Sequence, residues 1–527
     1  MRLFLPLLLI LAAGLSLLGG CEPKENMLSV KGKLEFRAPY LNGNFLDSRA
    51  DTVLFDTVFT RLTTVTKRLW VYNRNPRAVR IAQIRLGQPA ASPFTLIING
   101  DEVNTAAGLE LRGRDSLLIL VRAKLGGTDA NRPFLLTDDL LFTTNGNEQK
   151  VKLVAYGQNA YFHANEALAC DEVWRDDRPH VLFGQVQVRP GCTLRIGPGA
   201  RVYAHAGALL LVKGTLLVNE PADYRPGTTE KDTVKLTNRN IVRFLNDRRE
   251  PEYADVPGQW VGIVLDAESR GSRLRYCEIK NSVFGVLLFN PENRRPQPDL
   301  TLTNSVIRNI NGANVSAANP FASQGAGIYS VAGRLTATNC LFTNCGQLAL
   351  LGTGGTSCEL NFCTVANYAP GASRETPSLF FTTKLPTRPD GTTPFAPTAL
   401  TIRNCIIWGP RPAPGPNALE DELLLENPAQ FSSLIVERTL LRSKLYAAAT
   451  GTADRPGFNN SGNILNEDPK FRRTPENFFG AVFDYRLDVG SPALDKGQFS
   501  PLAPRDLLNL PRDAQKPDLG AFERREP

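Results

Sequence analysis

Apolar and polar residues alternate in short runs through much of the chain, and one six-residue pattern recurs five times. In each copy an apolar or small residue stands three and five places before a Cys or Ser, and an apolar residue follows two places after it. The alternation shifts by one residue just before the Cys or Ser. Alternation with a period of two is typical of β-strands, so the shift predicts two strands that meet at a corner and face one core. The copies are residues 276–281, 304–309, 339–344, 362–367 and 404–409.

The Cys or Ser of each copy is predicted to form an inward column, with one member per coil of a solenoid. Successive members are separated by 28, 35, 23 and 42 residues, so the shortest spacing is about one coil and the longer ones contain insertions. The last motif position is Asn four times and Gly once, which predicts a turn with a left-handed backbone and a stacked ladder. The inward column is Cys277, Ser305, Cys340, Cys363 and Cys405, and the ladder is Asn281, Asn309, Asn344 and Asn367.

These repeats resemble the pectate-lyase-like superfamily of right-handed parallel β-helices, and in particular its secreted and lipid-anchored bacterial members. Residues 257–263 (Pro-Gly-Gln-Trp-Val-Gly-Ile) are similar to the tryptophan-containing strand entry of that group. The resemblance extends from about residue 170 to the end, where 491–497, 506–507, 511–512 and 518–523 resemble its terminal coil. It implies that residues 161–527 form a right-handed parallel β-helix with a C-terminal closing coil. Such motifs identify a scaffold and assign no reaction.

The stretch from residue 29 to 160 has a different pattern of apolar and polar residues, in which short alternating strands are separated by turn residues. About seven strands at this spacing predict an antiparallel β-sandwich. They are 52–55, 67–72, 79–84, 94–98, 116–121, 139–142 and 151–154. Their order resembles immunoglobulin-like modules of ciliary and bacterial surface proteins, which implies a spacing or docking role. The chain is therefore expected to be all-β, with a sandwich followed by a β-helix.

The first 20 residues contain one basic residue, Arg2, and an apolar run from position 3 to 18. A short run of this kind before small residues and Cys21 is typical of a signal peptide and resembles the lipobox of bacterial lipoproteins. We interpret 1–20 as a signal peptide, Cys21 as the lipid-carrying residue and 21–28 as a tether. An ordinary signal peptide and a weak membrane helix are the alternatives. The expected location is the cell envelope, with a lipid anchor in the outer membrane on its periplasmic or its surface side.

Composition and cysteine content add limits on the partners. The 60 Lys and Arg residues exceed the 52 Asp and Glu residues, a mild excess that weakly favours acidic partners such as an anionic polysaccharide or lipid headgroups. No nucleic-acid partner is expected. Cys170 and Cys192 lie outside the inward column and are the candidates for a disulfide. No CxxC pair occurs and the three histidines are far apart in sequence, so no metal site or cofactor is expected.

Candidate chemistry depends on the outward positions that follow the corner. β-Helix enzymes that cut polysaccharides need paired carboxylates about 5–9.5 Å apart, or carboxylates that hold calcium beside a basic residue. Glu278 is the only carboxylate at these outward positions, which also include Arg308 and Trp408. Trp408 either stacks on a sugar ring or packs under the loop 410–416.

Loops provide the remaining candidates for ligand binding. The densest charged stretch, 246–255, includes Asp247 and Arg248. It either coordinates calcium or a uronate, or is satisfied by its own ion pairs. Insertions at 313–326, 370–398 and 410–416 are expected to project from the coils, where a binding surface would lie. The possible ligand-binding residues are Asp247, Arg248, Glu278, Arg308 and Trp408, and no residue is assigned a catalytic role.

The sequence favours a non-catalytic, lipid-anchored protein of the cell envelope. Its β-helix is expected to bind a polysaccharide or another envelope protein. A polysaccharide-active enzyme, a lyase or an epimerase-like protein that uses an outward groove and calcium, is the alternative hypothesis. A purely architectural component of a surface complex is the third.

Overall fold

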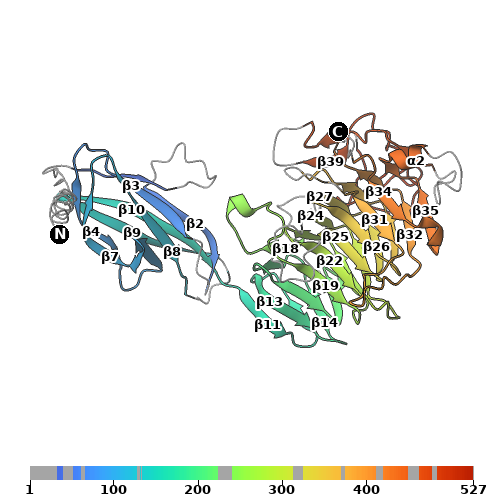
Figure 1. Cartoon of the computed structure of the whole chain (residues 1–527), viewed down its shortest axis with the longest axis horizontal. Helices are drawn as coiled ribbons and strands as arrows, with labels where there is room; N and C mark the ends of the chain where they lie inside the picture. The colour runs from blue at the N-terminus through green and yellow to red at the C-terminus, as the bar shows by residue number, and fades with distance from the viewer. Residues whose placement is uncertain are drawn as a thin grey trace, which may run out of the picture. The chain divides into compact units, whose positions relative to one another are not determined.

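The computed structural model describes residues 32–38, 51–60, 66–126, 131, 133–223, 240–311, 325–369, 374, 376–410, 419–448, 462–477 and 483–525. Cys21 and the expected signal peptide and tether lie outside the described residues, as do most of the insertions 313–326 and 410–416. The chain divides into two compact units, Met1–Asn159 and Ala160–Pro527. Figure 1 labels strands of both units.

The N-terminal unit is a β-sandwich of two five-stranded sheets. One sheet has the order β1 (Glu35–Arg37), β3 (Lys67–Tyr72), β8 (Ser116–Ala123), β5 (Phe94–Ile98) and β6 (Asp101–Val103). The other has the order β2 (Thr52–Phe59), β10 (Asn147–Gln158), β9 (Phe134–Thr144), β4 (Val79–Leu86) and β7 (Thr105–Leu111). Every pairing is antiparallel except that of β10 with β2, which is parallel.

Alternation along the strands builds the core of the sandwich. In β5, Phe94, Leu96 and Ile98 are buried, and the two residues between them are partly exposed. The Phe55 ring of β2 lies 5.7 Å from that of Phe94, so both sheets contribute to one core. The strands β1, β6 and β7 exceed the seven that the sequence predicts. β6 has the sequence Asp-Glu-Val, which gives no apolar alternation to recognise.

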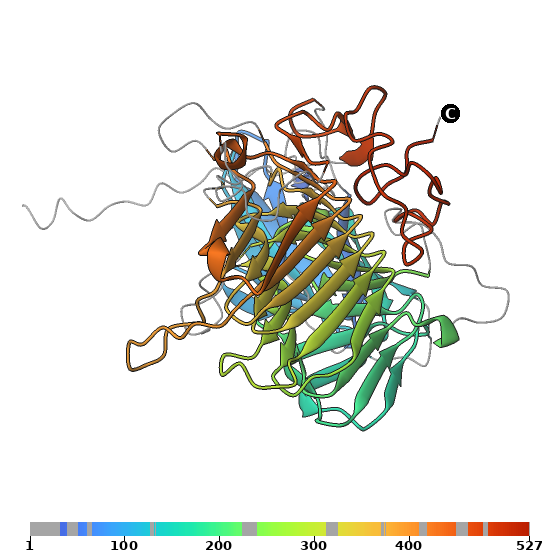
Figure 2. The same ribbon diagram turned by 90° about the vertical axis from the view of Figure 1, so that its right-hand side faces the viewer.

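The C-terminal unit is a right-handed parallel β-helix whose strands stack in three faces (Figure 2). Faces A and B together form an 18-stranded parallel sheet, and face C is a nine-stranded parallel sheet. The strand β11 (Tyr161–Ala167) and the first part of β13 (His180–Val188) begin face A, and the second part of β13 begins face B. A coil runs from face C to face A and then to face B.

Face A continues with β15 (Arg201–Ala204), β18 (Val242–Asn246), β21 (Cys277–Lys280), β24 (Val306–Ile310), β27 (Leu341–Cys345), β30 (Thr364–Ala366), β33 (Ile406–Trp408), β36 (Leu440–Leu441) and β37 (Ile464–Leu465). Face B continues with β16 (Leu209–Val212), β19 (Gly262–Asp266), β22 (Phe284–Phe289), β25 (Ala326–Val331), β28 (Leu348–Gly352), β31 (Leu379–Thr382) and β34 (Leu423–Glu426).

Face C contains β12 (Glu172–Trp174), β14 (Thr193–Ile196), β17 (Thr215–Val218), β20 (Ser272–Arg275), β23 (Asp299–Thr303), β26 (Arg334–Thr338), β29 (Ser357–Asn361), β32 (Ala399–Arg403) and β35 (Ser433–Glu437). Short 3-10 turns at Pro221–Asp223, Pro251–Tyr253 and Pro428–Gln430 and the helix α2 (Lys444–Ala448) lie in the connections.

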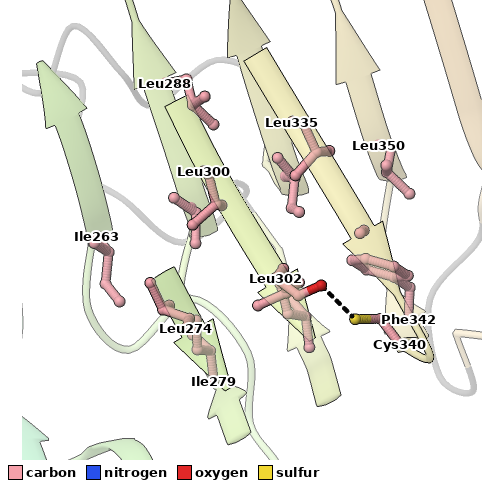
Figure 3. Close-up of a cluster of buried hydrophobic side chains, with 14 of the residues drawn as sticks. Ile263, Leu274, Ile279, Leu288, Leu300, Leu302, Leu335, Cys340, Phe342 and Leu350 are labelled. Atoms are coloured by element: carbon pink, nitrogen blue, oxygen red, sulfur yellow. Dashed lines mark hydrogen bonds between the residues drawn. The ribbon is translucent and has the colours of Figure 1, made fainter. Parts of the chain in front are cut away.

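The solenoid core consists of apolar columns that run through successive coils. On face A, Ile279 pairs with Ile307, Ile307 with Phe342 and Phe342 with Val365, and all four side chains are buried. Figure 3 shows part of this core, with side chains from the three faces pointing into one interior. Because each coil is stabilised by its neighbours, insertions between strands leave the stack intact.

The corner between faces C and A is formed by the residue that precedes the Cys or Ser of each motif copy. This residue has a positive φ in all five copies, from 40° at Tyr276 to 54° at Asn339 and Asn404. The inward column then follows, and each of its members is at most 1 % exposed. The Cys363 N–H donates to Cys405 Sγ at 3.4 Å, so members of neighbouring coils are in contact.

The turn from face A to face B carries the Asn ladder. Asn281, Asn309 and Asn344 have φ values of 63°, 56° and 53°. The Asn309 amide donates to Asn281 Oδ1 and the Asn344 amide to Asn309 Oδ1, both at 3.4 Å. The fourth expected member, Asn367, has no positive φ, and its Oδ1 instead accepts from the Cys345 N–H at 2.7 Å. The left-handed turn expected at every last motif position is therefore limited to the first three copies.

A disulfide and an aromatic stack lie at the start of the β-helix. Cys170 is bonded to Cys192. His163 and His180 stack on Trp174, with ring centroids 4.7 and 4.5 Å from it, although the three residues are separate in sequence. Burial, and then the neighbouring His163, lower the pKa of His180 to about 3, so this imidazole is neutral near pH 7.

Beyond β37 the chain leaves the stack. Residues 466–477 and 483–525, here called the C-terminal cover, pack against the outward side of face A (dark red in Figure 2). Within the cover, β38 (Phe471–Arg473) pairs antiparallel with β39 (Asp484–Leu487). The Gly520 N–H donates to Asn404 O at 2.8 Å, and the Asn304 amide donates to Asp506 O at 2.9 Å. The residues that resemble a terminal coil therefore lie along the side of the solenoid and do not add a further coil.

Candidate functional site

The outward side of face A changes character along the solenoid. In its first coils the outward positions are charged: Arg201 pairs with Arg243, Arg243 with Glu278, and Lys280 with Arg308. In the later coils they are apolar, and Val306, Leu341, Ile406, Trp408 and Leu440 are buried. We call Arg201, Arg243, Glu278, Lys280 and Arg308 the basic cluster.

Glu278 lies at the centre of the basic cluster. It is 4 % exposed, and Arg308 Nε donates to its Oε1 at 2.7 Å. Arg243 Nε lies 3.4 Å from the other carboxylate oxygen, so both oxygens of Glu278 face a guanidinium group. Burial by itself would raise the pKa of Glu278, but Arg308, Lys280 and Arg243 together lower it. Glu278 is therefore a carboxylate at neutral pH.

The loop after β18 forms a wall beside the cluster. Lys280 Nζ donates to Ala254 O at 2.7 Å, and Asp255 Oδ1 lies 3.4 Å from a terminal nitrogen of Arg308. Burial and the neighbouring Arg308 lower the pKa of Lys280, even though Glu278 and Asp255 oppose this effect. Arg243, Lys280 and Arg308 thus surround Glu278 and Asp255, and with Arg201 on the neighbouring strand the cluster retains positive charge.

The loop residues proposed from the sequence bind partners within the loop and its neighbours. Asp247 Oδ2 lies 2.6 Å from His205 Nδ1, and this contact raises the pKa of His205. Arg248 stacks over the Tyr253 ring at 3.7 Å, and its Nε lies 3.1 Å from Glu250 Oε2. The structure thus places Asp247 and Arg248 in local ion pairs, the second of the two alternatives that the sequence leaves open.

Trp408 is not an exposed platform, which corrects the expectation that it stacks on a sugar. Its side chain is only 8 % exposed and belongs to the buried cluster beneath the C-terminal cover. It also lies far from Arg308, because the column runs from Arg308 through Thr343 and Ala366 to Trp408. At ~4.8 Å per strand, these two residues are ~14 Å apart.

The C-terminal cover explains why the later outward positions are apolar. Phe471, Tyr485 and Leu487 of the cover pack with Leu341 and Trp408 of face A in one buried cluster. A sheet face covered by another layer has apolar residues on both sides, whereas a solvated face is polar. The apolar outward residues at 306, 341, 406 and 408 were therefore the signal in the sequence that this face is covered.

A buried ion cluster lies beside Trp408. Glu422 is fully buried, and Arg374 donates to both of its oxygens, at 2.8 and 2.7 Å. Arg442 also donates to Glu422, and its guanidinium lies 5.5 Å from the Trp408 ring. Because the carboxylate is enclosed by these two arginines and by Ser378, the arrangement holds the last coils together and leaves no oxygen for a ligand.

A pocket of about 620 Å³ opens between face A and the C-terminal cover. Its lining includes Tyr368, which lies shortly after β30, residues of β38 and of the segments on either side of it, and the two residues after β39. Sequence reasoning missed this pocket because it depends on contact between residues about 100 positions apart, such as Tyr368 and Phe471. Among the possible ligand-binding residues named from the sequence, Glu278 and Arg308 come from different strands and are in direct contact.

No group of three or more His, Cys, Asp or Glu side chains in the described part of the chain has an arrangement that could hold a metal ion. Among the helices of the described residues, none has the length and apolar character needed to cross a membrane.

No protein-family model and no curated protein matches the chain. A protein of unknown function from Porphyromonas gingivalis W83 aligns with 24% of this chain and 48% of its own length, at 10% identity and a TM-score of 0.16. The ASH/PapD-like domain of human CEP192 aligns with 24% of this chain and 85% of its own length, at 13% identity and a TM-score of 0.15. The chain spans about half of the first of these structures, and TM-scores this low carry no argument about function.

Proposed function

We propose that this protein is a non-catalytic binding protein of the cell envelope that binds an acidic glycan through the basic cluster on face A. The observation that carries the proposal is the partly buried excess of cations at the first coils. Side-chain exposures are 15% for Arg243, 13% for Lys280 and 23% for Arg308, so these groups are partly desolvated and still reachable. A carboxylate ligand would meet several charge-assisted hydrogen-bond donors there.

Arg201 is the cation most available to a ligand. It is partly exposed and lies directly beside Arg243, a pairing of like charges on neighbouring strands. Like charges placed opposite each other repel unless an anion lies between them. Because outward side chains recur at the strand spacing of ~4.8 Å, a polymer with repeated carboxylates suits this row better than a single small anion.

The state of Glu278 supports binding without catalysis. Hydrolysis of a glycoside needs two carboxylates that act as acid and as base or nucleophile. Glu278 accepts a hydrogen bond from Arg308 and forms an ion pair with Arg243, so its function is to hold the cations in place. The alternative of a lyase or an epimerase-like enzyme would require a different, ligand-facing carboxylate.

We also propose where the protein is located and to which family it belongs. We place the protein among the lipid-anchored bacterial members of the pectate-lyase-like β-helices, with a lipid on Cys21 and the immunoglobulin-like sandwich as a spacer. This placement supports an acidic glycan as the ligand because such polymers are components of cell envelopes. An envelope protein with an acidic surface is the other partner that the cluster could bind.

Binding of polygalacturonate and alginate, measured by calorimetry at low salt, tests the proposal. Arg201→Glu should weaken binding about tenfold, because it replaces attraction by repulsion at an exposed position. Arg334→Glu, at an exposed position on face C, is the matched control and should have no effect. Binding should fade with added salt, since exposed charges are screened within about 10 Å at 0.1 M.

Activity is assayed in parallel. Unsaturated-product absorbance and reducing-end release are recorded on the same polymers with and without calcium. Product that disappears in a folded Asp247→Ala variant would replace the binding hypothesis with the enzyme hypothesis. Failure of the wild-type protein to bind either polymer would reject the acidic glycan.

A further inference from the structure

The pocket beneath the C-terminal cover has a rigid aromatic floor. Tyr368 and Phe471 are only 6% and 3% exposed, so they close the bottom of the pocket and leave a ligand little ring surface. Tyr485 lies behind them, stacked on Tyr368 at 5.9 Å and edge-on to Phe471 at 5.5 Å. These three rings come from face A and from both strands of the cover, so the floor exists only in the assembled unit.

The rim of the pocket carries charged side chains of both signs in fixed turns. The Lys470 N–H donates to Asp468 Oδ1 and the Val489 N–H to Asp488 Oδ1, each at 2.8 Å. The Asn477 amide donates to Phe471 O at 3.1 Å and closes the turn after β38. Asp468, Lys470, Arg472 and Asp488 are exposed, and within the described residues none of them takes part in an ion pair. The second carboxylate oxygens and the cationic groups are therefore available to a ligand.

We propose that this pocket binds one or two neutral sugar residues. The volume of about 620 Å³ lies in the range of small-molecule sites. Carboxylates accept hydrogen bonds and Lys and Arg donate them, and a sugar hydroxyl can do both. A ligand with a net charge of either sign would meet a like charge on the rim, whereas a neutral polyol meets none.

The pocket and the basic cluster lie on the same face, which connects this inference to the proposed function on which it rests. Arg308 of the cluster is separated from Ala366 of β30 by one intervening strand, and Tyr368 lies shortly after β30. Tyr485 lies between them: its hydroxyl is 3.5 Å from Asn344 Oδ1, and Arg308 is near enough to oppose the rise that burial causes in the pKa of Tyr485. The glycan that this geometry favours therefore contains an acidic residue at the cluster and a neutral residue at the pocket.

The test uses the full mature protein and two sets of probes. Ligand-observed NMR and calorimetry are carried out with cellobiose, lactose and mannobiose, and separately with polygalacturonate. Lys470→Ala and Asp488→Ala should each weaken disaccharide binding about tenfold, the effect of losing a charged hydrogen-bond partner. Asp488→Asn, which keeps an acceptor oxygen, should bind the disaccharides more tightly than Asp488→Ala does. Asp390→Ala, at an exposed position in a different loop, is the control and should bind like the wild type.

The outcomes separate the two proposals. Polygalacturonate binding should persist in Lys470→Ala and Asp488→Ala and decrease in Arg201→Glu. If none of the three disaccharides binds the folded wild-type protein, or if both pocket variants bind them unchanged, the pocket inference is wrong even when polygalacturonate binds. If the wild-type protein binds a disaccharide but not polygalacturonate, the proposal of an acidic-glycan site at the basic cluster is wrong and the proposal of a sugar site in the pocket stands. Unchanged melting temperatures show that the variants are folded.

Discussion

At the scale of single residues, the inward thiols leave almost no free space at the corners. Cys340 is fully buried, with its Sγ 3.2 Å from Thr338 O and 3.5 Å from Leu302 O (Figure 3). We predict that Cys340→Lys costs about 3–5 kcal/mol of unfolding free energy because it buries an unpaired ammonium group. The measurement is urea unfolding followed by circular dichroism.

Thr336→Lys is the matched control for that prediction. Thr336 is on the same coil but points outward and is partly exposed, so the new ammonium group stays hydrated. Its cost should remain within about 0.5 kcal/mol. Equal unfolding midpoints for the two variants would mean that the inward column is misplaced.

Glu278 gives the β-helix a pH dependence whose sign follows from its surroundings. Its pKa in the folded protein lies below that of the unfolded chain, because the three cations outweigh the effect of burial. Its contribution is therefore complete above the unfolded value of about 4.3 and is lost as the pH falls through the lower folded value. Glu278→Gln should remove this acid-sensitive component and cost about 3 kcal/mol at pH 7, since the cations lose a buried partner.

The measurement for Glu278 is the unfolding free energy from pH 3 to 7 in both proteins. Glu359→Gln, at an exposed position on face C, serves as the control and should follow the wild-type curve. A Glu278→Gln protein as stable as the wild type at pH 7 would show that the carboxylate does not hold the cluster together.

At the scale of elements, a buried arginine, Arg512, joins the C-terminal cover to the corner between faces C and A. A terminal nitrogen of Arg512 donates to Asn339 Oδ1 at 2.9 Å and to Gly520 O at 2.8 Å, and the guanidinium lies 4.0 Å from the Phe362 ring. Arg512→Ala should loosen the cover, increase cleavage by trypsin in residues 466–525 and raise binding of a hydrophobic dye. The expected loss is about 3 kcal/mol, as for other broken buried pairs.

Arg525→Ala provides the comparison for Arg512. Arg525 is exposed and makes one hydrogen bond to Pro511 O, so its removal should leave cleavage unchanged. Identical cleavage of the Arg512→Ala and Arg525→Ala proteins would contradict a cover anchored at Arg512.

The strand elements differ in how far the sequence could predict them. The strands of faces C and A lie on the two sides of a corner that repeats five times. Both the corner and the inward residues lie where the alternation predicts them. In the sandwich, the polar strand β6 has no such pattern, and β10 pairs with β2 in parallel although an antiparallel arrangement was expected. Strand pairing between distant segments depends on the whole sheet, and local alternation cannot specify it.

At the scale of the whole molecule, the lipid anchor proposed at Cys21 would decide where the two units operate. The lipobox-like residues before Cys21 predict that Cys21→Ser abolishes metabolic labelling with palmitate and moves the protein from the membrane to the soluble fraction. Cys277→Ser, which changes a buried core thiol and leaves the leader intact, should remain labelled and membrane-bound. Continued sedimentation of the Cys21→Ser protein with membranes would reject the lipid anchor.

The sequence alone determined the all-β class, the coils and their inward column, because strand alternation and its one-residue shift at the corner are properties of a few adjacent residues. Only the tertiary structure decided which outward residues meet solvent. Trp408 is buried because the C-terminal cover folds back over face A, and Arg308 remains reachable because it lies in the charged coils that begin that face. The pocket floor likewise joins Tyr368 to Phe471 and Tyr485. Contacts across such separations arise from packing the whole unit, since burial is a property of the assembled surface.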